Sequence, residues 1–349
     1  MSNDLHLVIP ALFWPDTSLP EIYRDLQLPA LENLLARCSL TENESHGIES
    51  WLCEAFSVRR QQDWPVAPVT LQIDGSEKMK GAQDYWMRAD PVHLRLEHDR
   101  VVLADSQVFR ISREEAHELS GFLNRHFAAH GQEEIAFLPL QPNRWYFRVT
   151  RHSPASTHPV SQAINRDVTE LLPFGTNSAF WRGLFNEIQM LLHEHPVNQS
   201  REARGEFTIN SIWFWGGGVL PRTPACSYTH LWSNDIFAAS LASICGISHA
   251  DLPAGMDGWQ HSVAAGRHLV LLDVLQGKAQ YEDAYGWREG LKRLERDWFT
   301  PLGESLRQKR FDHITLTALG ECTTKNFAAS RGDLRKFWRR SKPVSTYAA

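Results

Sequence analysis

Three nearly continuous apolar runs predict buried strands along the chain. They are the segments Leu5–Phe13, His268–Leu275 and Phe311–Leu319. Continuous apolar runs are typical of parallel strands, because helices cover both faces of a parallel sheet. The segment Ser211–Trp215, with the sequence SIWFW, is a fourth candidate strand, and three consecutive glycines follow it. The pattern therefore predicts an α/β fold.

Between these runs, apolar residues recur every three or four positions, which predicts amphipathic helices. The segment Ser112–Phe127 opens with a capping box, in which Ser112 is the N-cap and Glu115 lies three residues later. Another helical segment is expected to end at Gly246, a C-cap glycine. Further helices are predicted within residues 28–38, 178–195 and 285–310, the last of them interrupted at Pro301.

The middle of the chain has a different pattern. Residues 91–105 and 144–150 alternate apolar and polar side chains, as half-buried antiparallel strands do. With the helices beside them, these strands predict an α+β unit over residues 89–210. We expect this unit to be inserted into a discontinuous α/β core formed by residues 1–88 and 211–349.

Composition narrows the class of protein. The chain has 349 residues, of which 42% are hydrophobic and 22% charged, as in ordinary globular proteins. No apolar run reaches the roughly 18–20 residues that span a membrane, and the N-terminus does not resemble a signal peptide. A formal net charge of −5 gives no global attraction to nucleic acid. The five cysteines are scattered and never form CxxC, which predicts reduced thiols in a cytoplasmic protein.

Residues 193–221 contain the densest set of candidate ligand-binding groups. His193 and His195 would lie about 200° apart on a helix, so we favour hydrogen bonds to the helix end over a shared metal. Arg201 and Arg204 share a helix face and could match a phosphate or carboxylate, but we favour a solvated basic face with salt bridges to the neighbouring Glu202 and Glu206. Gly216 and the two glycines after it could admit a ligand to the backbone. No dinucleotide or P-loop motif follows them, however, so we favour a tight turn.

The order of residues here resembles a family signature. His195-Pro196-Val197-Asn198, Arg201, Gly205, Asn210 and then IWFWGGG are similar to His-Pro-Val-Asn-x-x-Arg…Gly…Asn-x-Ile-Trp-Leu-Trp-Gly-x-Gly. That signature belongs to archaeal-type cofactor-independent phosphoglycerate mutases of the alkaline phosphatase superfamily. Residues 186–221 also resemble bacterial regulatory proteins of RpfE type, a divergent branch of that superfamily. The resemblance implies a three-layer α/β/α core with a mostly parallel sheet and an inserted α+β domain.

The resemblance also implies a surface that binds phosphate or carboxylate. Arg95 lies near the arginine of the family's Asp-Val-Ala-Phe-Arg segment, and Arg166-Asp167 stands where the family has His-Asp. Arg144 and Arg148 flank the place of another family arginine. The full set of ligand-binding candidates is Arg95, Arg144, Arg148, Arg166, Asp167, His195, Asn198, Arg201, Trp213, Trp215 and Gly216.

The family's metal ligands are replaced in this sequence. Enzymes of the superfamily use two divalent cations, held by Asp and His side chains, to stabilise phosphoryl transfer. Pro10-Ala11 stands in place of Asp-Gly at the end of the first strand. Gln276 and Gln280 replace an Asp and a His, and Glu321-Cys322 replaces Asp-His. The resemblance therefore implies a degenerate phosphoglycerate-mutase-like protein, with a regulatory or ligand-binding role and no metal cofactor.

Two other hypotheses remain open. The first is an active phosphoglycerate mutase or phosphatase with a rewired Mn or Zn site. Its ligands would come from Asp273, Glu321, Cys322 and the histidines His268 or His313. The second is a structural partner-binding module that uses a Trp-rich face or the basic segment 331–342.

Cysteine catalysis by Cys226 or Cys322 has no supporting local motif, so inert thiols are favoured. The expected ligand is a phosphorylated or carboxylate small molecule, and a protein partner is the alternative. We expect neither a membrane nor nucleic acid as partner.

Overall fold

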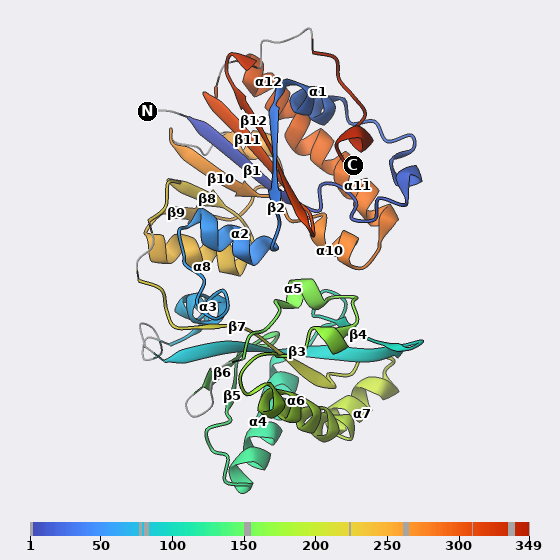
Figure 1. Cartoon of the computed structure of the whole chain (residues 1–349), viewed down its shortest axis with the longest axis vertical. Helices are drawn as coiled ribbons and strands as arrows, with labels where there is room; N and C mark the ends of the chain where they lie inside the picture. Colours follow the sequence, from blue (N-terminus) through green and yellow to red (C-terminus); the bar gives the residue numbers. More distant parts are fainter. Residues whose placement is uncertain are drawn as a thin grey trace. The chain divides into compact units, whose positions relative to one another are not determined.

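The computed structural model describes residues 3–76, 79, 84–149, 155–222, 225–260, 265–308, 310–333 and 339–348. The chain forms two compact units (Figure 1). Unit 1 comprises Met1–Phe56 and Ala225–Ala349, and unit 2 comprises Ser57–Pro224.

Unit 1 is built on a seven-stranded sheet in the order β2-β12-β11-β1-β10-β8-β9. The strands from β11 to β9 run parallel, and β12 and β2 are added antiparallel at one edge. This confirms the predicted α/β class, and the three predicted strands β11, β1 and β10 lie side by side. The bounds are β1 (Asp4–Pro10), β2 (Ser39–Glu44), β8 (His230–Trp232), β9 (Ser248–Ala250), β10 (Arg267–Leu271), β11 (His313–Leu319) and β12 (Thr323–Ser330).

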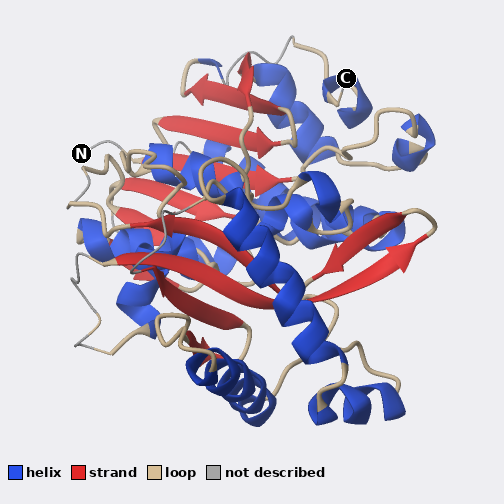
Figure 2. Ribbon diagram, turned by 60° about the horizontal axis from the view of Figure 1, so that its bottom comes forward, coloured by secondary structure: helices blue, strands red, loops and turns tan. Residues whose placement is uncertain are grey.

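Helices lie on both faces of this sheet (Figures 1 and 2). On one face, Leu5, Leu7 and Ile9 of β1 are buried in an apolar core with residues of α1, α11 and α12. On the other face lie α2 and α8. The helices of unit 1 are α1 (Pro29–Arg37), α2 (Ile48–Ala55), α8 (Ile236–Cys245), α9 (Met256–Gln260), α10 (Gln276–Gln280), α11 (Ala284–Leu294) and α12 (Thr300–Arg307), with short turns at Pro20–Tyr23 and Val344–Tyr347.

Two helix ends in unit 1 lie where the sequence predicts them. Gly246 ends α8 in the left-handed conformation, with φ 67°. The long helical segment is interrupted just before Pro301, where Glu295–Phe299 forms a π-helical turn between α11 and α12. Proline lacks an amide hydrogen and clashes with the carbonyl four residues earlier, and the wider turn relieves both problems.

Unit 2 contains a five-stranded antiparallel sheet in which β4, β3, β6 and β5 follow one another and β7 also pairs with β3. The capping box at Ser112 and Glu115 begins α4, as predicted. The strands are β3 (Tyr85–Glu97), β4 (Arg100–Ala104), β5 (Phe137–Gln141), β6 (Arg144–Val149) and β7 (Ser211–Gly218). The helices are α3 (Val66–Asp74), α4 (Arg113–Ala129), α5 (Val160–Ala163), α6 (Ser178–His193) and α7 (Pro196–Ala203), with a short turn at Val168–Glu170.

The assignment of the SIWFW strand to the parallel core sheet is wrong. This strand is β7, and it pairs antiparallel with β3, where Trp213 lies opposite Asp90. A continuous apolar run reports burial on both faces but does not identify the sheet. Here Phe214 packs against Trp181 of α6, while Trp215 lies against the buried Arg88. Consequently residues 57–88 and 211–224 fall in unit 2, whereas the sequence-based boundaries place them with the core.

Candidate functional site

In open α/β sheets, ligands bind at the carboxyl ends of the parallel strands. The central strand β1 ends there with Pro10, and Ala11 follows with φ 55°. The Ala11 amide donates to the Leu319 carbonyl (2.8 Å) and its carbonyl accepts from Trp287 Nε1 (2.8 Å). A left-handed residue here suits glycine best, which agrees with placing Ala11 at the glycine of the Asp-Gly pair in the resemblance. Pro10 then occupies the aspartate position and offers no side-chain ligand.

After the neighbouring strands, only some of the residues are acidic at the positions where the resemblance places metal ligands. Asp273 follows β10, and its pKa is raised by burial and by the Asp235 carboxylate. Asp235 caps α8 by accepting from the Ala238 amide at 2.7 Å. Gln276 and Gln280 are the first and last residues of α10, so amides stand where the resemblance places an Asp and a His.

The other two positions at which the resemblance places metal ligands lie on a tight turn between β11 and β12. Glu321 and Cys322 are both exposed there, and the Cys322 carbonyl accepts from the Ser45 amide at 2.9 Å. In the part of the chain that the structure describes, no group of three or more His, Cys, Asp or Glu side chains is arranged to hold a metal ion. The described residues at this edge therefore do not fit the two-metal centre that the resemblance implies.

The alternative ligand set is not assembled either. His268 lies at the amino end of β10, where it stacks on His230 at 4.6 Å. Asp273 is five residues further on, about 16 Å along an extended chain. His313 also lies at an amino end, that of β11, where its Nδ1 is 3.1 Å from Asp4 Oδ1. The two histidines and the carboxyl-end residues thus occupy opposite ends of the strands.

In unit 2, the arginine of the family-like signature is an internal anchor. The Arg201 side chain is 2% exposed. Its Nε donates to the Phe207 carbonyl (2.6 Å), Nη1 to both oxygens of Glu115 (2.9 Å each), and Nη2 to the Arg110 carbonyl (2.9 Å). The guanidinium therefore ties α7 to the start of α4 and to the loop between α7 and β7, and a ligand would have to displace these partners.

The other polar residues of the signature also bind the backbone. Asn198 donates to the carbonyls of Leu192 (2.7 Å) and Ile209 (2.9 Å) and accepts from the Ile209 amide (2.7 Å). His195 does not bind the end of the preceding helix, which was the favoured prediction. Because Pro196 starts a new helix, His195 caps α7 instead, and its Nδ1 accepts from the Val197 amide at 3.2 Å. Burial lowers the pKa of His195, so the ring is neutral near pH 7.

A buried ion pair in β3 escaped the sequence reasoning. Arg88 and Asp90 lie two residues apart and therefore on one face of the strand, and three hydrogen bonds of 2.8–3.0 Å join them. Asp90 also accepts from Trp215 Nε1 (2.8 Å), and the Arg88 guanidinium lies over the rings of Tyr146 and Trp215. In the sequence, the signal for this ion pair was the alternation of the charged Arg88 and Asp90 with apolar neighbours. The hydrogen bond from Trp215 Nε1 to Asp90 places the predicted ligand-binding candidate Trp215 in this network.

The remaining candidates are dispersed over unit 2. Arg144 is held by Asp74 through two hydrogen bonds of 2.7 and 2.8 Å, and Trp213 Nε1 donates to the His158 carbonyl (2.9 Å). A side chain at Gly216 would place its Cβ 2.9 Å from a Val66 carbon.

Among the exposed arginines, Arg148 pairs with Asp84 at 3.2 Å and Arg95 pairs with Glu97. Pairing through Val102 brings Arg95 and Asp167 to one row of the sheet, and the exposed Arg166 is adjacent to Asp167. These three residues are the part of the predicted set that the fold gathers at a surface.

Comparison with known proteins supports the resemblance in one part of the chain. Residues 78–198 match the family model of 2,3-bisphosphoglycerate-independent phosphoglycerate mutase. The mutase of Methanosarcina barkeri is 33% identical over 129 residues, which are 36% of this chain and 31% of that protein. A probable mutase of Geobacter sulfurreducens is 28% identical over 144 residues, 41% of this chain and 35% of that protein. The matched segments thus span only about a third of these relatives.

Two solved structures share the fold. The cofactor-independent phosphoglycerate mutase of Thermoplasma acidophilum superposes with a TM-score of 0.51 at 13% identity, covering 100% of this chain and 95% of that one. The PH0037 protein of Pyrococcus horikoshii gives a TM-score of 0.51 at 11% identity, covering 94% and 87%. The chain is therefore phosphoglycerate-mutase-like in fold, and the match to the family model lies within unit 2.

Proposed function

We propose that this chain is a phosphoglycerate-mutase-like protein that has lost two-metal phosphoryl transfer and acts as a cytoplasmic regulatory or ligand-binding protein. The bacterial RpfE-type resemblance supports the same assignment. Within the described residues, no helix is both long and apolar enough to cross a bilayer.

One observation carries the proposal. At the carboxyl end of β1, Pro10 stands where the resemblance places a metal-binding aspartate, and the adjacent Ala11 has a positive φ of 55°. The backbone retains the shape that the resemblance implies, while the ligand is replaced by a residue that cannot bind a cation. After the neighbouring strand β10, glutamines at both ends of α10 stand where the resemblance places an Asp and a His. Phosphoryl transfer of this type requires the metals to stabilise both attacking and leaving oxygens, so losing their ligands removes the reaction.

The matching relatives are named as mutases, so an active enzyme is the alternative to test. The purified full chain is assayed for interconversion of 2- and 3-phosphoglycerate with added Mn²⁺, and its bound Mn and Zn are quantified. The mutase of Thermoplasma acidophilum is the positive control. We expect no turnover and substoichiometric metal. Turnover together with stoichiometric metal would reject the proposal in favour of a rewired enzyme.

Anion binding is tested separately in unit 2. The exposed Arg95 and Arg166 are each replaced by alanine, and thermal stabilisation by 3-phosphoglycerate and by inorganic phosphate is measured. Arg204→Ala is the matched control, because Arg204 is also an exposed, ion-paired arginine of unit 2 but does not belong to the sheet row of Arg95 and Asp167. A phosphate-binding surface predicts that stabilisation is lost in the first two variants only. If neither anion stabilises the wild-type chain, the structural partner-binding alternative is favoured.

A further inference from the structure

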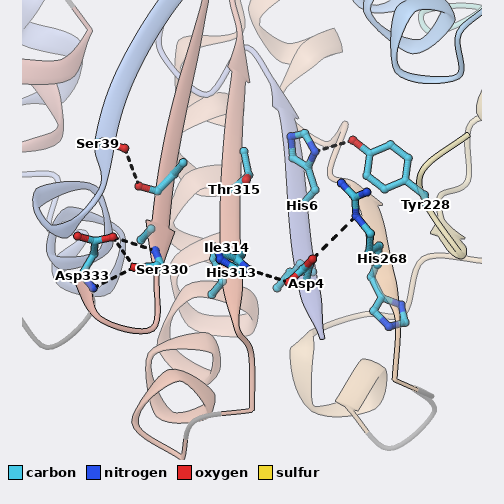
Figure 3. A pocket seen from close by; sticks show the side chains of 14 residues that line it. Asp4, His6, Ser39, Tyr228, His268, His313, Ile314, Thr315, Ser330 and Asp333 are labelled. Atoms are coloured by element: carbon cyan, nitrogen blue, oxygen red, sulfur yellow. Dashed lines mark hydrogen bonds and ion pairs between the residues drawn. The ribbon is translucent and has the colours of Figure 1, made fainter. Parts of the chain in front are cut away.

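Unit 1 contains a pocket of about 450 Å³ at the amino ends of its parallel strands, opposite to the edge discussed above. Most of the side chains that line it come from β1, β10, β11, β12 and β2, and Tyr228 and Asp333 lie just outside these strands (Figure 3). Its volume falls in the range of about 300–1,000 Å³ that is typical of small-molecule sites.

Strand register defines the floor of this pocket. Arg267, Asp4, His313 and Ser330 are successive cross-strand partners, so they form one row across four strands. His6, Thr315, Ala328 and Ser39 form the next row. Directly opposed residues share a face of a sheet, and the floor is therefore an array of polar and charged side chains.

A polar floor is unusual on central parallel strands, whose faces are normally apolar because helices cover them. Along β11, Ile314, Leu316 and Ala318 enter the apolar core on one face. His313, Thr315 and the fully buried Thr317 alternate with them and must point to the opposite face. The central strand is thus amphipathic where packing alone would favour apolar residues.

A rigid hydrogen-bonded chain forms one wall. His6 Nε2 lies 2.7 Å from Thr317 Oγ1. The Nδ1 atom of His6 lies 2.7 Å from the Tyr228 hydroxyl (Figure 3). Because the Thr317 hydroxyl donates to Asn326 Oδ1 (2.6 Å), it must accept from His6 Nε2–H. The Nδ1 lone pair then accepts from Tyr228. Tyr228 in turn supports the Arg267 guanidinium, which lies 5.9 Å from its ring centroid.

Two opposite charges stand side by side in this pocket. Arg267 Nε is 3.9 Å from Asp4 Oδ2, a loose contact, and the Arg267 side chain is 52% exposed. Among the described residues, neither Nη atom of Arg267 has a hydrogen-bond partner. The Asp4 carboxylate also lies 3.1 Å from His313 Nδ1. The pair therefore presents an open guanidinium fork beside a fixed carboxylate.

We propose that this pocket binds a free α-amino acid. The ligand carboxylate binds the Nη edge of Arg267, and the ligand ammonium binds Asp4, whose strand is about 4.8 Å away. The ligand side chain lies over Thr315 and Ala328. A simple anion would be repelled by Asp4 and a simple cation by Arg267, whereas a zwitterion with both charges on one carbon satisfies both. The pocket lies away from the replaced metal positions, so this inference does not depend on the proposed loss of phosphoryl transfer.

The test is calorimetric titration of the full chain with a panel of α-amino acids. N-acetyl amino acids and amino acid methyl esters are the matched analogues, since each lacks one of the two charges. We expect saturable binding of at least one amino acid, and at least about tenfold weaker binding of both its analogues, equivalent to about 1.4 kcal/mol.

Asp4→Asn and Arg267→Gln should each abolish the binding, while Arg296→Gln should not. Arg296 is a suitable control because it is exposed on the same unit and pairs with Asp297. Circular dichroism verifies that each variant is folded. The proposal is overturned if no amino acid binds at millimolar concentration, if an analogue binds as well as its parent, or if folded Asp4→Asn and Arg267→Gln bind like the wild type.

Discussion

Replacing Arg201 with methionine removes a guanidinium that donates four hydrogen bonds inside unit 2, while keeping most of the volume of its side chain. The change leaves the carbonyls of Arg110 and Phe207 without this donor and removes the buried partner of Glu115. Breaking a buried ion pair by removing one member costs about 3–5 kcal/mol. Glu115 is 20% exposed and stays within 3.3 Å of Arg204, so we expect a value near the lower end.

The assay is urea unfolding followed by tryptophan fluorescence. With an m-value of about 2 kcal/mol per molar urea, a loss of about 3 kcal/mol lowers the midpoint by roughly 1.5 M. Arg204→Met is the matched control. Arg204 shares the Glu115 contact but is 49% exposed, and exposed ion pairs contribute little, so its midpoint should stay within error of the wild type.

The result distinguishes two roles for the signature arginine. A ligand-binding arginine would change affinity and leave the unfolding midpoint nearly unaltered. If Arg201→Met folds and unfolds at the same urea concentration as Arg204→Met, the structural role assigned to Arg201 is refuted.

Three further substitutions test other parts of the structure. Burial lowers the pKa of His6 from 6.5 to about 4, so the folded state binds fewer protons than the unfolded state between these values. The free energy of unfolding should therefore fall as pH drops from 6.5 to 4. His6→Gln should make the unfolding midpoint less dependent on pH between these values. Gly216→Ala should lower the melting temperature more than Gly131→Ala; both glycines have positive φ, but only at Gly216 would the new Cβ meet a Val66 carbon at 2.9 Å. Asn198→Ala should cost about 2–3 kcal/mol in urea unfolding, because buried carbonyls and an amide lose their partner; an unchanged midpoint would contradict that account.

Much of the candidate site could not be read from residue types. Arg201 and Arg204 are equivalent by spacing, yet one is buried with backbone acceptors and the other is exposed. The difference depends on the carbonyls of Phe207 and Arg110, which accept from the Arg201 guanidinium, and Arg110 is 91 residues distant from Arg201 in the chain. His195 was placed correctly near a helix end, but only the fold reveals that it caps the helix that follows.

The sequence by itself determined the elements whose signals are local. Runs rich in apolar residues identified β1, β10 and β11, because the buried parts of these strands select apolar side chains. Ser112 with Glu115, and Gly246, marked helix ends, because caps satisfy backbone groups only a few residues away.

Tertiary structure decided which elements pair and which side chains meet. The SIWFW strand carries the same apolar signal as a core strand, yet it pairs with β3, since burial does not encode a partner. Asp4, Arg267 and His313 come from three distant segments, and only the register of β1, β10 and β11 places them in one row. Register depends on the packing of whole sheet faces and on the closure of long loops, and neither is contained in any short stretch of sequence.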